Sequence, residues 1–235
     1  MGRLLLVRHG QASFGAADYD VLSPTGWEQG RALGRWLAAR GVVPTSIVRG
    51  DLARHRDTLA AMREGAGESA AAGWPTEVVD ADWNEFDHVA LVAAAVDLLG
   101  PEHAGRDHHT LSRREFQDLF ERATARWSAG EPGDYPETWN DFTGRVQRAL
   151  GLAAEDAGSG RTVVVVTSGG PIGVCAAHLA DPEDPDPAGL ARRWQRFNTV
   201  AVNTGVTPLV VGGTGVRMLG FNDHAHLDDA LRTYR

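Results

Sequence analysis

The sequence predicts a three-layer α/β/α fold, in which helices cover both faces of a mostly parallel sheet. Two apolar runs, 4–7 and 163–166, are continuous rather than alternating, which is typical of strands buried on both faces. Segments with helical periodicity separate the predicted strands, as a parallel sheet requires. In open sheets of this kind, ligands bind at the carboxyl ends of the strands, so we expect the functional residues there.

Length, charge and cysteine content limit the possible classes of protein. The 235 residues fit one domain, 1–235, with a large insertion. The formal net charge of −8, without a compensating basic run, argues against a nucleic-acid partner. No apolar run is long enough for a signal peptide or a membrane span, and the single Cys175 favours a reducing cytoplasm. The oligomeric state stays open, and a homodimer is compatible with the sequence.

The first candidate functional residues, Arg8 and His9, follow the run at 4–7, and Gly10 allows a sharp turn after them. A neutral imidazole is a usable nucleophile near neutral pH, and a guanidinium group is a planar, charged donor suited to phosphate oxygens. The pair suggests phosphoryl transfer through a phosphohistidine. For an isolated Arg-His-Gly motif, a histidine that only binds backbone is the commoner case, so partners elsewhere must decide.

Clear signals mark the first predicted helix. Ser23 is a typical N-cap, Pro24 fits the first helical position, and Gly41 is a typical C-terminal stop. Short apolar runs then predict strands at 45–48 and 78–80.

A second phosphate-binding candidate lies in the segment 49–58, where a predicted helix carries Arg54 near its first turns. The N-terminus of a helix directs N–H groups and a partial positive charge toward an anion, and Arg54 adds a bidentate donor. A solvated helix face is the alternative explanation of Arg54. The segment 65–73 is rich in Gly and Ala and is expected to be a loop.

Glu85 is the candidate general acid. It is flanked by Trp83 and Phe86, and an apolar environment raises the pKa of a carboxyl group, as a general acid needs near neutral pH. Asp82 and Asp87 are rival carboxylates, for which capping or turn roles are the simpler explanation.

The range 88–157 is predicted to be a helical insertion. Ser112 and Glu115 have the spacing of a capping box, and Thr138 begins a further helix. Both helices carry aromatic residues at helical intervals, which we interpret as core. We expect the insertion to lean over the carboxyl edge of the sheet as a cap and to determine substrate selectivity.

The turn Ser168-Gly169-Gly170 follows the run at 163–166 and precedes a helix expected to start at Pro171. Such a turn suits an anion, and an ordinary tight turn is the alternative. Further along the chain we expect a loop at 181–187 and strands at 199–203, 209–211 and 216–219.

A metal site is not expected. His224 and His226 lie beside carboxylates, and Asp107, His108 and His109 form another short cluster, but neither group has a further ligand set with metal-site spacing. We therefore predict no metal and no other cofactor.

Together these segments resemble the histidine phosphatase superfamily, also called the phosphoglycerate mutase-like family. The resemblance covers most of the chain, in an order and spacing that are specific although each piece is weak, and it implies a phosphoglycerate mutase-like fold. The segments are Val7-Arg8-His9-Gly10-Gln11, Leu22-Ser23-Pro24-Thr25-Gly26, Gly50-Asp51-Leu52-Ala53-Arg54, Asn84-Glu85 and Val166-Thr167-Ser168-Gly169-Gly170.

The resemblance also implies roles for these residues. His9 would be the phosphorylated nucleophile, and Glu85 would protonate the leaving oxygen. Arg8 and Arg54 would bind the phosphoryl oxygens. Further candidates for substrate binding are Gln11, Ser13, Ser168 and Gly169.

Three departures from the family pattern matter. Ser168 stands where the family usually has a second pocket histidine, and serine can donate a hydrogen bond but cannot carry a charge, so the pocket should be less cationic. Gly15 stands where the mutase-like signature usually has asparagine. Phe86-Asp87-His88 replaces an Arg-His-Tyr-like continuation, which argues against mutase activity.

The missing histidine has three explanations. Ser168 and the N–H groups of Gly169 and Gly170 suffice, another histidine such as His224 or His55 reaches the pocket, or catalysis has been lost. We favour the first explanation, because the other site residues are all present: Arg8, His9, Arg54 and Glu85.

The expected function is that of a metal-free phosphomonoesterase of the histidine acid phosphatase type, acting on a small phosphorylated metabolite. The alternatives are a phosphomutase, and a catalytically silent module that binds a phosphorylated metabolite or protein. The sequence does not identify the substrate.

Overall fold

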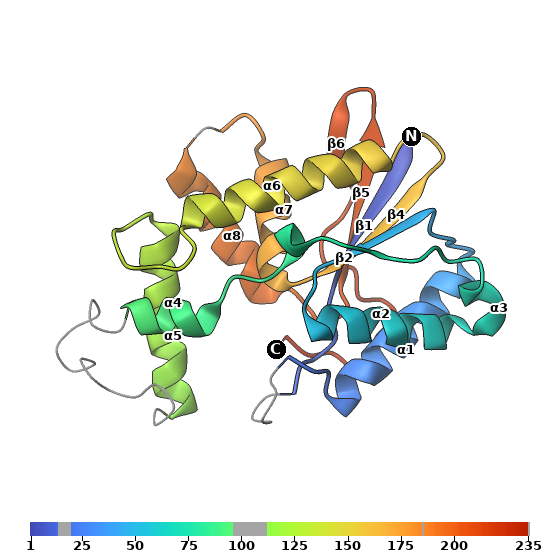
Figure 1. The fold of residues 1–235 in the computed structure, drawn as a ribbon, viewed down its shortest axis with the longest axis horizontal. Helices are drawn as coiled ribbons and strands as arrows, with labels where there is room; N and C mark the ends of the chain where they lie inside the picture. Colours follow the sequence, from blue (N-terminus) through green and yellow to red (C-terminus); the bar gives the residue numbers. More distant parts are fainter. Residues whose placement is uncertain (14–19, 96–111, 185, 235) are drawn as a thin grey trace.

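Strands and helices alternate over residues 2–79, whereas the described residues between 88 and 156 are mainly helical (Figure 1). The computed structural model describes residues 1–235 except 14–19, 96–111, 185 and 235. In chain order the elements are β1 (Gly2–Arg8), α1 (Pro24–Ala39), β2 (Ser46–Arg49), α2 (Ala53–Ala66), α3 (Glu68–Ala71), β3 (Val78–Val79), the 3₁₀ turn η1 (Ala81–Trp83), α4 (His88–Ala95), α5 (Arg113–Ser128), α6 (Trp139–Asp156), β4 (Thr162–Thr167), α7 (Gly169–Ala180), α8 (Pro187–Val200), β5 (Val206–Gly212) and β6 (Gly215–Met218).

The strands of the described residues form one sheet with the order β3-β2-β4-β1-β5-β6. β4 lies parallel to both β2 and β1, with Val165 opposite Leu6 of β1 and Val164 opposite Ile47 of β2. β3 continues the parallel part, and β5 and β6 add antiparallel strands at the other edge. The predicted α/β fold with a mostly parallel sheet is confirmed.

Helices cover both faces of this sheet. On one face, α1 and α2 pack against Val164 and Val166 of β4. On the other face, α6, α7 and α8 pack against Val163 and Val165. Because neighbouring side chains of a strand point to opposite faces, four consecutive valines serve two cores. Since β1, β2 and β4 are parallel, their carboxyl ends and the N-termini of α2 and α7 meet at one edge of the sheet.

Local signals explain the first helix. The Ser23 hydroxyl accepts a hydrogen bond from the N–H of Gly26 at 3.1 Å, and Pro24 occupies the first helical position. Gly41, just beyond the helix, has φ +63°, a backbone conformation that favours glycine. These predicted helix signals are confirmed.

Gly34 allows α1 and α2 to approach each other closely. A Cβ at this position would lie directly against the Met62 carbonyl oxygen and 2.8 Å from the Ala66 nitrogen. We expect Gly34→Ala to lower the free energy of unfolding by about 1–3 kcal/mol, as overpacking does, measured by urea denaturation. The control is Gly151→Ala on α6, where nothing lies within 4 Å, and alanine should stabilise by about 0.5–1 kcal/mol. Equal shifts in the two variants would contradict this account.

Two predicted segments are wrong. The range 65–73 is not a loop, because α2 continues to Ala66 and the alanine-rich α3 follows Gly67, which has φ +83°. The range 199–203 is not a strand, because most of it completes or directly follows α8. Asp186 caps α8 by accepting the N–H groups of Ala188 and Gly189, and Pro187 fits its first turn.

The predicted insertion at 88–157 consists of two parts that lie in different places in the structure. α6 packs on the sheet through Val146, Leu150 and Ala153, so it belongs to a layer of the fold and the predicted cap is too long. α4 and α5 lie beside the sheet rather than on it (Figure 1). The capping box predicted at Ser112 is present, and Thr138, where a helix was expected to begin, forms a second one with Asp141. In the described part of the chain, no helix has the length and apolar composition to span a membrane.

Candidate active site

His9 follows β1 directly and is held on both sides by backbone hydrogen bonds. Its N–H donates to the Thr167 carbonyl at 2.8 Å, and its carbonyl accepts from the Asn203 side chain at 3.1 Å and from the Thr204 N–H at 3.3 Å. The residue is 6% exposed. The position of the imidazole is therefore determined by the sheet, which is the rigid support that a catalytic group needs.

The imidazole of His9 is arranged to react through Nε2. Its Nδ1 lies 2.7 Å from the Gly10 carbonyl oxygen, which can only accept, so this contact assigns the ring proton to Nδ1 and the lone pair to Nε2. Burial, followed by the charges of Arg54 and Arg8 and by His55, lowers the pKa of His9 well below its usual value. The ring is therefore held in its neutral, nucleophilic form.

Arg54 lies in the first turn of α2, as predicted, and is 8% exposed. Its Nη1 donates to Asp20 Oδ1 at 2.6 Å, while Asp20 Oδ2 accepts the Ala53 N–H at 2.7 Å. One turn later, the Thr58 hydroxyl accepts the Gly10 N–H at 2.9 Å and donates to the Arg54 carbonyl at 2.7 Å. Asp20 and Thr58 therefore position Arg54 beside His9, a role that the sequence alone did not indicate.

Arg8 lies at the end of β1 and reaches toward the last residues of the chain. Its Nη1 donates to the carbonyls of Ala201 and Tyr234, the latter at 2.8 Å. Its charge lowers the pKa of both His9 and Glu85, which places the guanidinium within the same cluster. A Cβ on Gly169 would lie 3.5 Å from Arg8 Nε, so the start of α7 belongs to this cluster as well.

Glu85 enters the site from the segment after η1. Its Oε2 accepts the Gly170 N–H at 3.0 Å, and its Oε1 accepts the Phe86 N–H at 3.3 Å. A Cβ on Gly170 would lie 3.0 Å from the Glu85 carboxyl carbon, so this close approach requires glycine. Burial raises the pKa of Glu85, although both N–H donors, Arg54 and Arg8 oppose the shift. The carboxyl group therefore holds its proton to higher pH than an exposed glutamate.

Ser168 lies at the end of β4 and is fully buried. Its Oγ is 2.8 Å from Nε2 of His55, whose ring centroid is 5.7 Å from that of His9. Of the two histidines considered as replacements for the family histidine, His55 reaches the site, whereas His224 places its Nδ1 2.6 Å from the Asn222 carbonyl oxygen. The Gly170 N–H, considered as an anion donor, has Glu85 as its acceptor.

Gln11 and Ser13 lie in the loop between β1 and α1. The Gln11 side chain accepts from the Ser23 hydroxyl at 3.0 Å, and the backbone N–H of Gln11 donates to Gln29 Oε1 at 2.8 Å. The Ser13 N–H donates to the Val21 carbonyl at 2.8 Å. These contacts shape the loop, and the role of both residues in substrate binding stays a prediction.

The rival carboxylates have other partners. Asp87 Oδ1 accepts the N–H groups of Val89 and Ala90 at the start of α4, and Asp82 lies 3.5 Å from Arg148. Both roles agree with the capping and surface interpretation.

The described residues contain no group of three or more His, Cys, Asp or Glu side chains arranged to hold a metal ion. His226 places its Nε2 3.0 Å from the Thr204 hydroxyl. The predicted features at Gly15 and at Asp107, His108 and His109 lie outside the described residues.

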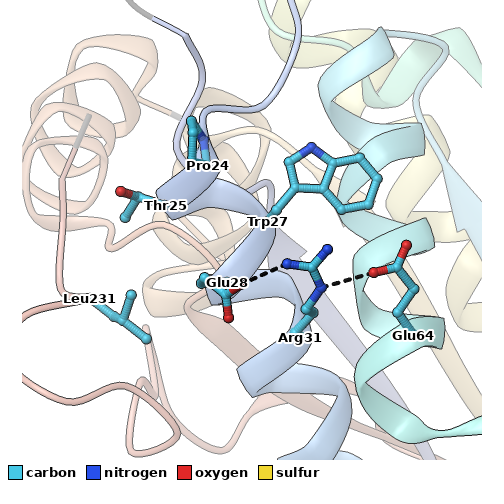
Figure 2. Close-up of a pocket in the computed structure, with 7 residues that line it drawn as sticks. All are labelled: Pro24, Thr25, Trp27, Glu28, Arg31, Glu64 and Leu231. Carbon is cyan, nitrogen blue, oxygen red and sulfur yellow. Dashed lines mark hydrogen bonds and ion pairs between the residues drawn. The ribbon is translucent and has the colours of Figure 1, made fainter.

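Two cavities differ in whether predicted site residues line them. Figure 2 shows one of ≈ 610 Å³, where Arg31 lies between Glu28 and Glu64 and donates to them at 2.7 and 2.8 Å; none of the predicted site residues lines it. The other, of ≈ 260 Å³, is lined by Glu85. Its further lining includes Phe86, Leu91, Trp127, Tyr135 and Arg145. Only the smaller cavity borders the candidate acid.

One protein family matches most of the chain. A sequence model described as the histidine phosphatase superfamily, branch 1, matches residues 4–91 and 101–224. A search of the curated proteins finds no match.

Several solved structures share the fold. A phosphoserine phosphatase mutant from Entamoeba histolytica, in complex with phosphoserine, superposes with a TM-score of 0.63 at 16% identity, covering 97% of this chain and 100% of that one. A putative alpha-ribazole-5'-P phosphatase from Escherichia coli has a TM-score of 0.63 at 18% identity, with coverage of 95% and 97%. A mycobacterial glucosyl-3-phosphoglycerate phosphatase with inorganic phosphate has a TM-score of 0.62 at 23% identity, with coverage of 97% and 100%.

Proposed function

Because the chain belongs to the histidine phosphatase superfamily, we propose that it is a metal-free phosphomonoesterase that works through a phosphohistidine at His9. The observation that carries this proposal is the state of His9. Its Nδ1 binds the Gly10 carbonyl, its ring is kept neutral, and the positive charges of Arg8 and Arg54 lie beside it. A neutral imidazole with two guanidinium groups suits attack on a dianionic phosphate ester.

In the first step, the Nε2 lone pair of His9 attacks the phosphorus and the bond to the ester oxygen breaks. Glu85 gives its proton to the departing alcohol oxygen, which avoids the release of an alkoxide. Arg8 and Arg54 stabilise the charge on the phosphoryl oxygens.

In the second step, water attacks the phosphohistidine. Glu85, now a carboxylate, takes a proton from this water, the P–N bond breaks, and inorganic phosphate leaves. His9 and Glu85 return to their starting states, so the cycle needs no co-reactant other than water.

We propose that the leaving group occupies the cavity of ≈ 260 Å³ beside Glu85. The aromatic and aliphatic side chains of Phe86, Leu91 and Trp127 favour a partly apolar group, and Arg145 and Tyr135 add polar atoms to the lining. The substrate is then a small phosphate ester, and the substrates named for the fold neighbours form a natural first panel.

We expect phosphate release from p-nitrophenyl phosphate to be unchanged by EDTA. The reason is that the nucleophile, the cationic groups and the acid are all side chains of this chain. The measurement is inorganic phosphate released with and without EDTA, followed by addition of Mg²⁺ or Zn²⁺. Activity that EDTA removes and a divalent ion restores would contradict the metal-free mechanism.

The two alternative functions give different products. A phosphomutase moves the phosphoryl group within a substrate such as a phosphoglycerate, which ³¹P NMR follows without free phosphate appearing. A silent binding module releases nothing but binds inorganic phosphate.

We also propose a cytoplasmic location for the protein. Its single cysteine, Cys175, is buried, and burial raises the pKa of the thiol to about 12.

A further inference from the structure

His55 fills the space beside Ser168 from a different element of the fold. Its side chain comes from the third residue of α2, whereas Ser168 follows β4. Both residues are fully buried, and His55 Nε2 lies 2.8 Å from Ser168 Oγ. The His9 N–H donates to the carbonyl of Thr167, so Ser168 comes next in the chain at the same edge. The ring centroids of His9 and His55 are 5.7 Å apart.

Gly50 makes room for this imidazole. A Cβ on Gly50, at the end of β2, would lie 2.7 Å from His55 Cε1 and 2.6 Å from Asn84 Oδ1. Any side chain at this position would push the ring away from Ser168. The small residues at the ends of β2 and β4 therefore leave one imidazole-sized space, which His55 occupies.

We propose that His55 and Ser168 act as one hydrogen-bonded pair that donates to the phosphoryl group held at His9, with the imidazole supplied by α2 and the hydroxyl by the end of β4. The inference rests on the proposed phosphatase function. His55 is a positioning residue in it, because Ser168 makes the contact with phosphate.

The hydrogen-bond network supports this direction of donation. Burial, with the charges of Arg54 and Arg49, lowers the pKa of His55 well below its usual value, so the ring is neutral and has one N–H. A backbone hydrogen bond at Gly50 opposes this shift, but Nδ1 has no partner of normal geometry, so the proposal places the ring proton on Nε2. This N–H donates to Ser168 Oγ, which leaves the Ser168 O–H proton for a phosphoryl oxygen. The pair thus adds a donor without adding a charge.

Substitutions at His55 separate hydrogen bonding from packing. His55→Leu keeps much of the volume but has no donor, and we expect kcat/KM for p-nitrophenyl phosphate to fall by roughly 10- to 100-fold. His55→Gln places an amide N–H near the position of Nε2 and should retain most of the activity. A Gln variant as poor as the Leu variant would show that His55 acts through shape alone, and would overturn the proposal.

The strongest test moves the imidazole to the other element. Ser168→His alone should lose activity, because two imidazoles then compete for one space. The double variant His55→Ala/Ser168→His should recover activity relative to both single variants, since the imidazole now comes from β4. Losses that simply add in the double variant would contradict the pair.

Controls keep folding and function apart. Thermal unfolding is measured for every variant, and His178→Leu, at the far end of α7, serves as the matched histidine control. If His55→Leu does not fold, Ser168→Ala removes only the hydroxyl and should give a similar loss of activity. Wild-type activity in Ser168→Ala would overturn the proposal.

The proposed phosphatase activity and the proposed role of the His55–Ser168 pair can be tested separately. If wild-type protein binds inorganic phosphate by calorimetry but releases none from esters, the phosphatase proposal fails. The pair is then judged by phosphate affinity, which should fall in His55→Leu and persist in His55→Gln. If wild-type protein neither turns over esters nor binds phosphate, both proposals are overturned.

Discussion

Replacing His9 by alanine should abolish turnover, with a loss of roughly 10³-fold or more in kcat for p-nitrophenyl phosphate. The imidazole is the only group in the proposed cycle that bonds to phosphorus, so even a good leaving group cannot bypass it. The contacts that hold this position use the backbone N–H and carbonyl of His9, so the variant should keep its fold.

Chemical trapping tests the intermediate directly. Wild-type protein mixed with ³²P-labelled substrate and quenched rapidly should carry a label that is stable in alkali and lost in acid, as expected of a phosphohistidine. His9→Ala should carry no label, whereas His178→Ala should be labelled like the wild type. Substantial turnover in a folded His9→Ala variant would rule out His9 as the nucleophile.

Glu85→Gln should slow the hydrolysis of alkyl phosphates by about 10²- to 10⁴-fold, the usual contribution of general acid catalysis. Aryl phosphates need less protonation of the leaving oxygen, so their loss should be smaller. The measurement is kcat for phosphoserine and for p-nitrophenyl phosphate in both proteins. Glu64→Gln on the surface of α2 is the matched control. Equal losses for both substrates would remove Glu85 from the role of acid.

The pH profile gives an independent check of the proposed roles of His9 and Glu85. His9 must be neutral to attack, and its lowered pKa extends activity toward acid. Glu85 must be protonated in the first step, and its raised pKa extends activity toward neutral pH, so the rate falls as pH rises through that pKa. For alkyl phosphates, the decline on the alkaline side should disappear in Glu85→Gln, while the decline on the acid side should remain.

Sequence reasoning placed the candidate site residues at one edge of the sheet because each lies beside a recognisable element. Arg8 and His9 end a buried strand, Arg54 begins a helix, and Glu85 lies between two aromatic residues. Parallel strands then bring these segments to one edge, so topology alone predicts their proximity. The roles of these residues in catalysis still rest on the experiments above.

The supporting contacts could not be predicted in this way. Asp20 binds Arg54 across 34 residues, and Asn203 binds the His9 carbonyl across 194, and no local pattern links such pairs. The sequence named His55 only as one of two histidines that could reach the pocket and did not favour it, because His55 follows Arg54 in a helix that looks like a solvated face. The missed α8 is different, since its Asp186-Pro187 start signal was present in the sequence.

The two hydrogen bonds that Arg8 donates to carbonyl groups cannot be removed by ordinary side-chain substitution of the acceptor residues. Both acceptors, at Ala201 and Tyr234, belong to the main chain, so substitution of either side chain leaves them in place. An alanine scan of the segment after β6 would therefore miss its contribution to the orientation of Arg8. Only shortening the chain, or an ester in place of the peptide bond, would weaken the contact at Tyr234. In this protein the Tyr234 side chain can be replaced without removing the hydrogen bond that its carbonyl accepts from Arg8.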